Sequence, residues 1–186
     1  MHLACKEEVG GMHTPGVAIR SAVIDDASVL ADLGARTFRD GFGPDNTEAD
    51  MTAYLRRSFS PEIQTREIAD PASRFLISDI DGRAVGYARL KLGEAPTCVT
   101  GIRPVKIARF YADTPWIGKG VGAQLMAACL DEARGLGCDV IWLGVWERNP
   151  RAIAFYSKWG FREVGEQKFM LGDDLQHDVV MERPAG

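Results

Sequence analysis

The hydrophobic and polar positions of the chain follow patterns typical of short strands and amphipathic helices. In the second half, an apolar run rich in strand-forming residues, from Ile107 to Ala112, leads into a glycine-rich turn. A further apolar run, Val140 to Trp146, predicts another strand. Between the two runs, apolar residues recur at helical spacing at Val121, Leu125, Met126, Cys129, Leu130 and Ala133. We therefore expect strand, glycine turn, helix and strand in succession.

The N-terminal half predicts one strand, three helices and a hairpin of two strands. The expected helix starts carry capping residues: Asp25-Asp26, Asn46 or Thr47, and Ser60 before a proline. Asp81-Gly82 between two apolar runs is a strong hairpin signal. The expected strands lie at 17–24, 74–80 and 83–92, with two further strands at 162–170 and 178–182, separated by a turn at 172–174.

A chain of 186 residues is expected to form one domain with a real hydrophobic core. Residues 1–16 contain Gly10-Gly11 and Pro15 and have no periodicity, so we expect a flexible N-terminal tail in which Met12 is a second candidate start. Residues 17–186 are expected to form the single domain.

The turn Gly118-Lys119-Gly120-Val121-Gly122-Ala123 has the composition of a phosphate-binding site. Glycine lets backbone N–H groups approach a ligand closely, and a helix N-terminus adds a positive dipole end. A P-loop is excluded because glycine stands where Ser or Thr is required. A loose dinucleotide fingerprint is satisfied, but only Asp139 lies near the acidic position expected about 20 residues later. A tight turn that merely permits helix–strand packing is a third alternative.

The segment after the second strand adds a further pattern. Asn149, Phe155-Tyr156 and Gly160-Phe161, following this order of elements, resemble the GNAT superfamily of N-acetyltransferases, which bind acetyl-CoA. The resemblance implies an α/β (α+β) GNAT acyl-CoA N-acyltransferase fold. Its sheet is expected to be mixed, mostly antiparallel, with about seven strands flanked by helices.

The family pattern for the turn is Gln/Arg-x-x-Gly-x-Gly/Ala. Gly120 and Gly122 fit it, whereas Ile117 stands where Gln or Arg is usual. Because the family contacts there come largely from backbone N–H groups, we expect this departure to weaken the diphosphate site without removing it. The resemblance implies a cofactor site made by Phe110, Tyr111, Ala112, Ile117, Gly118, Lys119, Gly120, Val121, Gly122, Ala123, Asn149, Tyr156 and Lys158.

Several of these residues also have purely structural interpretations. Asn149 before Pro150 is an ideal helix N-cap, although the family aims this amide at the pantetheine. The Phe110 side chain is expected to pack in the core while its backbone pairs with the pantetheine. Lys119 either neutralises phosphate charge or is simply solvated. Lys158 either reaches the ribose phosphate or is an exposed lysine.

Tyr156 is the expected general acid. A phenol with a pKa of about 10 keeps its proton at neutral pH, whereas a thiolate, whose thiol pKa is about 8.5, benefits from protonation as it leaves. The base is not identified. Many relatives place a glutamate on the central strand, where this chain has Ala108. A water relay or another acid such as Asp113 are the alternatives.

Composition adds modest constraints. A net charge of -4 and a pI of about 5.4 argue against nucleic acid and anionic membranes as partners, and no apolar run is long enough to span a membrane, so the cytoplasm is expected. The cysteines and histidines have no metal-ligand spacing, so no metal and no disulfide framework is expected. Glu48, Asp50, Asp173 and Asp174 can attract a polycation, or are ordinary helix-start and turn residues.

The leading interpretation is an acetyl-CoA-dependent N-acetyltransferase that acts on a small-molecule primary amine by direct attack in a ternary complex. Further segments resemble the branch that contains bacterial PaiA-type spermidine/spermine acetyltransferases, which suggests a polyamine: Thr37-Phe38, Phe42, Asn46, Asp50-Met51, Tyr54-Leu55, 142–147 and 170–174 with Asp178. Three alternatives stay open: a protein N-terminal or lysine acetyltransferase, a non-catalytic acyl-CoA sensor, and more remotely a dinucleotide-binding oxidoreductase. A homodimer is compatible with the pattern.

Overall fold

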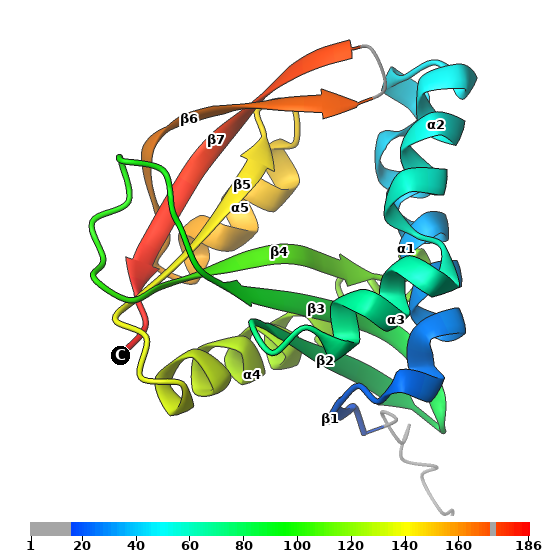
Figure 1. Ribbon diagram of the computed structural model, residues 1–186, viewed down its shortest axis with the longest axis horizontal. Coiled ribbons are helices and arrows are strands. Elements are labelled where there is room, and N and C mark those ends of the chain that lie inside the picture. The colour runs from blue at the N-terminus through cyan, green and yellow to red at the C-terminus, as the bar shows by residue number, and fades with distance from the viewer. Residues whose placement is uncertain (1–15, 172–173) are drawn as a thin grey trace, which may run out of the picture.

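The computed structural model describes residues 16–171 and 174–186. Their strands form one sheet in the order β1-β2-β3-β4-β5-β7-β6, with five α-helices packed around it (Figure 1). The elements are β1 (Ala18–Ser21), α1 (Ala27–Phe42), α2 (Glu48–Ser58), α3 (Pro61–Ala69), β2 (Ser73–Ile80), β3 (Arg83–Leu92), β4 (Pro104–Ala112), α4 (Val121–Gly135), β5 (Val140–Trp146), α5 (Pro150–Lys158), β6 (Arg162–Leu171) and β7 (Asp174–Pro184).

The sheet is mixed, as the sequence predicted. β4 and β5 are parallel neighbours, and the other adjacent strands are antiparallel. The β2–β3 turn has φ values of 50° at Asp81 and 76° at Gly82, so it is the left-handed hairpin turn that this dipeptide favours. The expected seven-stranded architecture is therefore confirmed.

Helices cover both faces of the sheet (Figure 1). On one face, α4 places Leu125 and Met126 against Ile107 of β4. On the other face, Leu33 of α1 packs with Tyr87 of β3. Each fully buried leucine contributes about 1.5–3 kcal/mol through the apolar surface that it removes from water. This burial holds the long strands β3 and β4 rigidly between two layers of helix.

Two of the expected helix caps are confirmed and one is not. The Asp50 N–H donates to the Thr47 hydroxyl at 3.2 Å, and the Ile63 N–H donates to the Ser60 hydroxyl at 3.3 Å. Asp26 precedes α1 but does not cap it with its side chain. Its carboxylate instead accepts hydrogen bonds from the Arg20 guanidinium and the Val23 N–H, which leaves it unavailable to the helix.

Element bounds differ from the sequence prediction in three places. β1 is shorter than expected, because a 3₁₀ turn at Ile24–Asp26 precedes α1. β4 begins three residues earlier, at Pro104, and β7 extends the last strand at both ends. Residues 1–15 of the expected tail at 1–16, and residues 172 and 173 of the expected turn at 172–174, lie outside the described residues.

A buried ionic cluster fastens α3 to the strands. The Glu67 carboxylate binds the guanidinium groups of Arg89 and Arg109, whose side chains are about one-tenth exposed. Arg109 also donates to Gln64 at 3.2 Å and to the Ser58 carbonyl at 3.0 Å. Every charge in this cluster has a partner, which offsets the cost of removing the ions from water.

Candidate active site

The sheet opens between its two parallel strands. β4 pairs with β5 over three residues only, 104–106. Just beyond, Ala108 is an extra residue inserted between the positions opposite Leu90 and Arg89 of β3. Such a bulge bends the strand and increases its twist. Residues 107–112 therefore diverge from β5 (Figure 1), and no described strand pairs with this edge of β4. An extended ligand arm can pair there as an added strand does.

The glycine turn shapes the start of α4. Gly118 and Gly120 have φ values of 79° and 89°, the left-handed region that glycine tolerates best. The N–H groups of residues 121–123 precede the first hydrogen bond of the helix, from the Gln124 N–H to the Gly120 carbonyl at 3.1 Å. No side chain caps this helix. Three adjacent donors are therefore left without a partner in the described chain, as an anion-binding helix start requires.

Two donors expected from the sequence are used within the turn itself. The Ile117 N–H donates to the Thr114 carbonyl at 3.3 Å, and the Lys119 N–H donates to the Trp116 carbonyl at 3.2 Å. The Lys119 ammonium lies 5.1 Å from the centroid of the Trp116 ring, an exposed cation–π contact. The donors left for a ligand therefore centre on Gly120–Ala123, fewer than the sequence indicated.

Residues 110–112 contribute their side chains to the core. The Phe110 ring lies 5.7 Å from the Phe155 ring on the α5 side of the sheet. The Tyr111 ring lies on the opposite face, 5.5 Å from the Tyr87 ring, and Ala112 belongs to a small cluster beneath the start of α4. The expected core packing of Phe110 is confirmed, and the backbone of these residues forms the open edge of β4.

Tyr156, the expected proton donor, is in the second turn of α5 and faces the sheet. Its ring makes edge contacts with Phe110 at 6.1 Å and Phe161 at 5.7 Å between centroids. Burial raises the pKa of the Tyr156 hydroxyl above the ordinary phenol value. The hydroxyl therefore carries its proton at neutral pH, and the ring that bears it contacts Phe110 of the open edge.

Asn149 has the capping geometry expected of it. Its Oδ1 accepts a hydrogen bond from the Ala152 N–H at 3.1 Å, with Pro150 in the first turn of α5. The Nδ2 group donates to no acceptor within the described residues. The cap uses only the Oδ1 atom of the amide, so the structural and ligand-binding interpretations are compatible.

One side chain of α5, Phe155, comes close to the start of α4. The Phe155 ring lies 3.6 Å from the position that a Cβ on Gly122 would take. Lys158 is exposed and follows Phe155 by one helical turn, in the last turn of α5. Its charge lies at the C-terminal end of the helix, where the dipole favours a cation.

Carboxylates that the sequence singled out have partners. Both oxygens of Asp113 face the Arg36 guanidinium, at 3.2 and 3.0 Å. Glu48 pairs with Arg39 at 2.8 Å, which favours its interpretation as an ordinary helix-start acid. Asp174 accepts from the Gln176 amide at 2.9 Å. Asp113 is therefore engaged by a cation, which disfavours it as a base.

Sequence reasoning named Asp178 only within the branch resemblance and did not predict that it forms a buried polar group on β7 with Gln176. Asp178 is 9% exposed and Gln176 is 6% exposed, and both lie on the sheet face that α1 and α2 approach. Lys106 of β4 is half-buried nearby, with its ammonium 4.8 Å from the Trp142 ring centroid. The available signal was that the polar residues 176, 178 and 182 are separated by even numbers of positions and therefore share one face of the strand.

The cysteines are part of the core. Cys129 and Cys138 lie in the main apolar cluster as free thiols, as expected of small core residues. In the ranges 16–171 and 174–186, no three His, Cys, Asp or Glu side chains converge as metal ligands.

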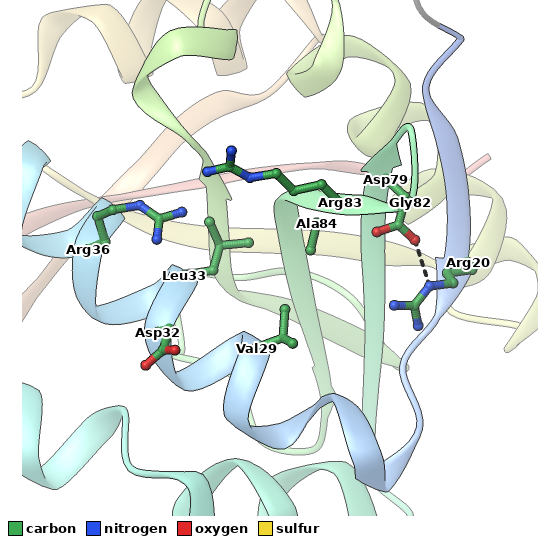
Figure 2. A pocket seen from close by; sticks show the side chains of 9 residues that line it. All are labelled: Arg20, Val29, Asp32, Leu33, Arg36, Asp79, Gly82, Arg83 and Ala84. Carbon is green, nitrogen blue, oxygen red and sulfur yellow. Dashed lines mark hydrogen bonds and ion pairs between the residues drawn. The ribbon is translucent and has the colours of Figure 1, made fainter.

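A cavity of about 380 Å³ lies elsewhere, between α1 and the β2–β3 hairpin (Figure 2). Its arginines face carboxylates: Arg20 binds Asp79 at 2.6 Å, and Arg83 lies 3.9 Å from Asp113. The residues drawn in Figure 2 include none of the glycine turn or of α5. This cavity is therefore separate from the opening between β4 and β5.

Comparison with known proteins identifies the family. Residues 36–161 match the Acetyltransferase (GNAT) family. The chain is 32% identical over 168 residues to an uncharacterized N-acetyltransferase of Lactobacillus delbrueckii subsp. lactis, covering 90% of this chain and 97% of that protein. The chain therefore belongs to the GNAT family, and it is an acyl-CoA-dependent N-acyltransferase.

Two further similar proteins have more specific names. A mycothiol acetyltransferase of Clavibacter sepedonicus is 33% identical over 151 residues, covering 80% of this chain and 44% of that protein. PaiA N-acetyltransferase from Thermoplasma acidophilum, solved in complex with coenzyme A, has the same fold, with a TM-score of 0.73 and 20% identity. That match covers 91% of this chain and 99% of the PaiA chain. Among the described residues, no helix is long and apolar enough to cross a membrane.

Proposed function

We propose that the protein transfers the acetyl group of acetyl-CoA to a primary amine of a small molecule, a polyamine being the first candidate, by direct attack in a ternary complex. One observation carries the proposal: the open edge of β4 leads to a helix start whose first N–H groups have no partner among the residues that the structure describes. Residues 107–112 and 121–123 thus supply consecutive backbone donors and acceptors along one path. A pantetheine arm and a diphosphate need these groups in that order.

The chain's own groups account for binding. Each charge-assisted hydrogen bond from residues 120–123 contributes about 1.5–3 kcal/mol, and the dipole of α4 adds about 0.3–1 kcal/mol. Lys119 and Lys158 add positive charge near the phosphates, and the Asn149 Nδ2 donates to the pantetheine. Ile117 contributes no polar side chain, so backbone N–H groups make most of the hydrogen bonds to the diphosphate.

When bound, acetyl-CoA supplies an activated acyl thioester. Tyr156 then acts as general acid and donates its hydroxyl proton to the leaving thiolate. Its raised pKa keeps it protonated before the reaction, because burial disfavours the phenolate. Proton transfer of this kind contributes about 10²–10⁴-fold to a rate.

Replacing Tyr156 with Phe tests the role of its hydroxyl. Tyr156→Phe is expected to lower kcat by more than roughly tenfold, because the thiolate loses its proton donor. Thiol release from acetyl-CoA, measured over a panel of polyamines, amino acids and peptides, gives kcat, and calorimetry gives the affinity for acetyl-CoA. That affinity is expected to change little.

Tyr87→Phe is the matched control. Tyr87 is buried on β3, and its hydroxyl has no hydrogen-bond partner within the described chain. Its removal is expected to leave kcat unchanged. Full activity of Tyr156→Phe would refute the proton-donor role. If the wild-type protein binds acetyl-CoA but acetylates no amine, the sensor interpretation is favoured instead, and turnover on peptides alone would favour a protein acceptor.

A further inference from the structure

Asp178 lies where the two parallel strands part. It is opposite Trp146 of β5 and Gln167 of β6. A Cβ added to Gly144 would lie 2.9 Å from the Asp178 Oδ2 and 2.2 Å from the Gln167 Nε2. Gly144 is two residues beyond Trp142, the last β5 residue paired with β4. The carboxylate therefore covers the backbone of β5 just past the point of divergence, on the face away from α4.

The Asp178 carboxylate is poorly paired for a buried group. Its side-chain partner among the described residues is the Gln167 amide, which donates to Oδ2 at 3.3 Å, near the long limit for such a bond. Within 16–171 and 174–186 no ammonium or guanidinium lies within ion-pair distance of it. A buried carboxylate without a cation is costly, unlike the Glu67 carboxylate with its two arginines. A bound cation would relieve that cost.

A second acceptor lies two residues away on the same face. The Asn46 Nδ2 donates to the Phe42 carbonyl at 2.7 Å, so the Asn46 Oδ1 faces the Gln176 Nε2, which donates to it at 2.7 Å. This chain of bonds fixes the Gln176 amide with its Oε1 on the other side. That oxygen is buried and has no partner within the described residues. Carboxylate and carbonyl oxygens are acceptors only, so the group that completes them must be a donor.

Aromatic rings border the two acceptors. Trp146 and Phe169 are the cross-strand neighbours of Asp178 and Gln176. The Phe42 ring of α1 lies 5.6 Å from the Trp146 ring, and the Tyr54 ring of α2 lies 5.5 Å from the Phe169 ring. Aromatic faces attract alkylammonium groups and pack against their methylene chains. The surroundings therefore suit a primary alkylammonium better than a metal ion.

We propose that Asp178 is the general base of the acyl transfer, and that Asp178 and the Gln176 carbonyl oxygen together bind the ammonium group of the amine acceptor. This inference rests on the proposed function, because it names the acceptor side of the same reaction. It supplies the proton acceptor for which the central strand offers only Ala108 at its bulge.

The step balances as follows. The Asp178 carboxylate takes one proton from the ammonium and becomes a carboxylic acid, and the amine nitrogen regains its lone pair. The nitrogen attacks the thioester carbon, so that a C–N bond forms and the C–S bond breaks. The sulfur takes the electron pair of that bond and the proton of Tyr156. The amide nitrogen returns its second proton to the Tyr156 oxygen, and Asp178 releases the first proton to solvent.

Titration of Asp178 gives the pH dependence. Burial raises the pKa of its carboxyl above the ordinary value, and the Gln167 hydrogen bond and the Lys106 charge partly oppose this. The charged or titratable groups that face it are Lys106 from β4 and Tyr54 from α2. Because the base must be ionised, kcat/KM is expected to fall as the pH drops through this raised pKa.

Asp178→Asn tests the base in the full-length protein. The variant keeps the shape of the side chain, and kcat/KM with spermidine or n-butylamine is expected to drop about 100-fold. The decrease of kcat/KM at low pH is expected to disappear in the same variant. Glu166→Gln is the charge-matched control, because Glu166 is exposed on the neighbouring strand β6 and is paired with Val179, not with Asp178.

Binding separates this inference from the proposed function. Calorimetric titration of the coenzyme A complex with each amine needs no turnover, and coenzyme A affinity shows that each variant is folded. Amine binding is expected to weaken at least about tenfold in Asp178→Asn, which is 1.4 kcal/mol, and to persist in Glu166→Gln. Gln176→Met, which removes the carbonyl oxygen, is expected to raise the amine KM more than it lowers kcat.

Each outcome decides one claim. A wild-type protein that acetylates the amines while Asp178→Asn keeps full activity and an unchanged pH profile overturns this inference and leaves the proposed function standing. A wild-type protein that binds the amines through Asp178 but never acetylates them overturns the proposed function and the base, and leaves the ammonium site. Absence of both binding and turnover overturns both.

Discussion

Two largely buried carboxylates, one at each half of the sheet, are paired differently. In the β3–β4 half, the Glu67 carboxylate is shared by Arg89 and Arg109, and every charge has a partner. In the β5–β7 half, Asp178 has one long hydrogen bond, and the Gln176 oxygen has none in the described chain. Complete pairing identifies a group that holds elements together. For a buried carboxylate such as Asp178, where a missing counter-charge is costly, we infer that the partner comes from outside the chain.

Glu67→Gln removes the counter-charge of the two arginines in the β3–β4 half. Of all the variants it is expected to have the largest effect, on the free energy of unfolding. It leaves two buried guanidinium groups without a counter-charge, so the free energy of unfolding is expected to fall by about 3–5 kcal/mol. Urea denaturation measures the loss. Glu94→Gln, at an exposed loop position, is the control and is expected to change stability little. Unaltered stability in Glu67→Gln would show that the cluster does not fasten α3.

The glycine turn, which starts α4 beside the opening between β4 and β5, can be tested with two of its glycines. Gly120→Ala forces a Cβ into a φ of 89° and is expected to cost about 1–2 kcal/mol, with a parallel loss of acetyl-CoA affinity as the helix start shifts. Gly122→Ala has room, because its nearest neighbour is the Phe155 ring at 3.6 Å. Calorimetry measures the acetyl-CoA affinity of each variant and thermal unfolding its stability, and Gly122→Ala is expected to lose less of both. Equal behaviour of the two variants would contradict the role of the left-handed turn.

The smallest expected effect is on the pH dependence of stability, and it compares Asp26 with Asp178. The Arg20 hydrogen bonds lower the pKa of Asp26, whereas burial raises the pKa of Asp178. Stabilisation by Asp26 is therefore fully present above its unfolded pKa of about 3.9 and is lost as the pH falls through its lower folded value.

Asp26→Asn should accordingly flatten the acid side of the stability curve, by about 1 kcal/mol or less, because Arg20 is partly exposed. Unfolding free energies measured from pH 2 to 7 would reveal it. A variant whose curve still declines as steeply as that of the wild type would show that Asp26 is not responsible.

Much of the fold followed from local patterns. Helical spacing from Val121 to Ala133, the Asp81-Gly82 turn and the caps at Thr47 and Ser60 each depend on near neighbours, so the sequence displays them directly. Family motifs then placed the glycine turn beside the central strand. The predicted roles of the site residues stay predictions, although their positions along one opening agree with them.

What escaped prediction depends on distant partners. Asp178 and Glu182 alternate in the same strand and look alike in sequence. Glu182 accepts three hydrogen bonds, from the Thr100 N–H and hydroxyl and from Arg162, whereas Asp178 accepts one. Only the fold reveals which strand end or loop comes near each carboxylate. The same limit hid the use of the Ile117 and Lys119 N–H groups inside their own turn.

The short parallel pairing of β4 with β5 has a mechanical consequence. In the described chain, three residue pairs form the only strand pairing that joins the two halves of the sheet. A ligand arm that pairs with β4 would add backbone hydrogen bonds where β4 and β5 diverge, and would so strengthen the connection between the two halves of the sheet. Deuterium uptake by the β5 amides is therefore expected to slow as acetyl-CoA is added, because the sheet opens less often when the ligand is bound.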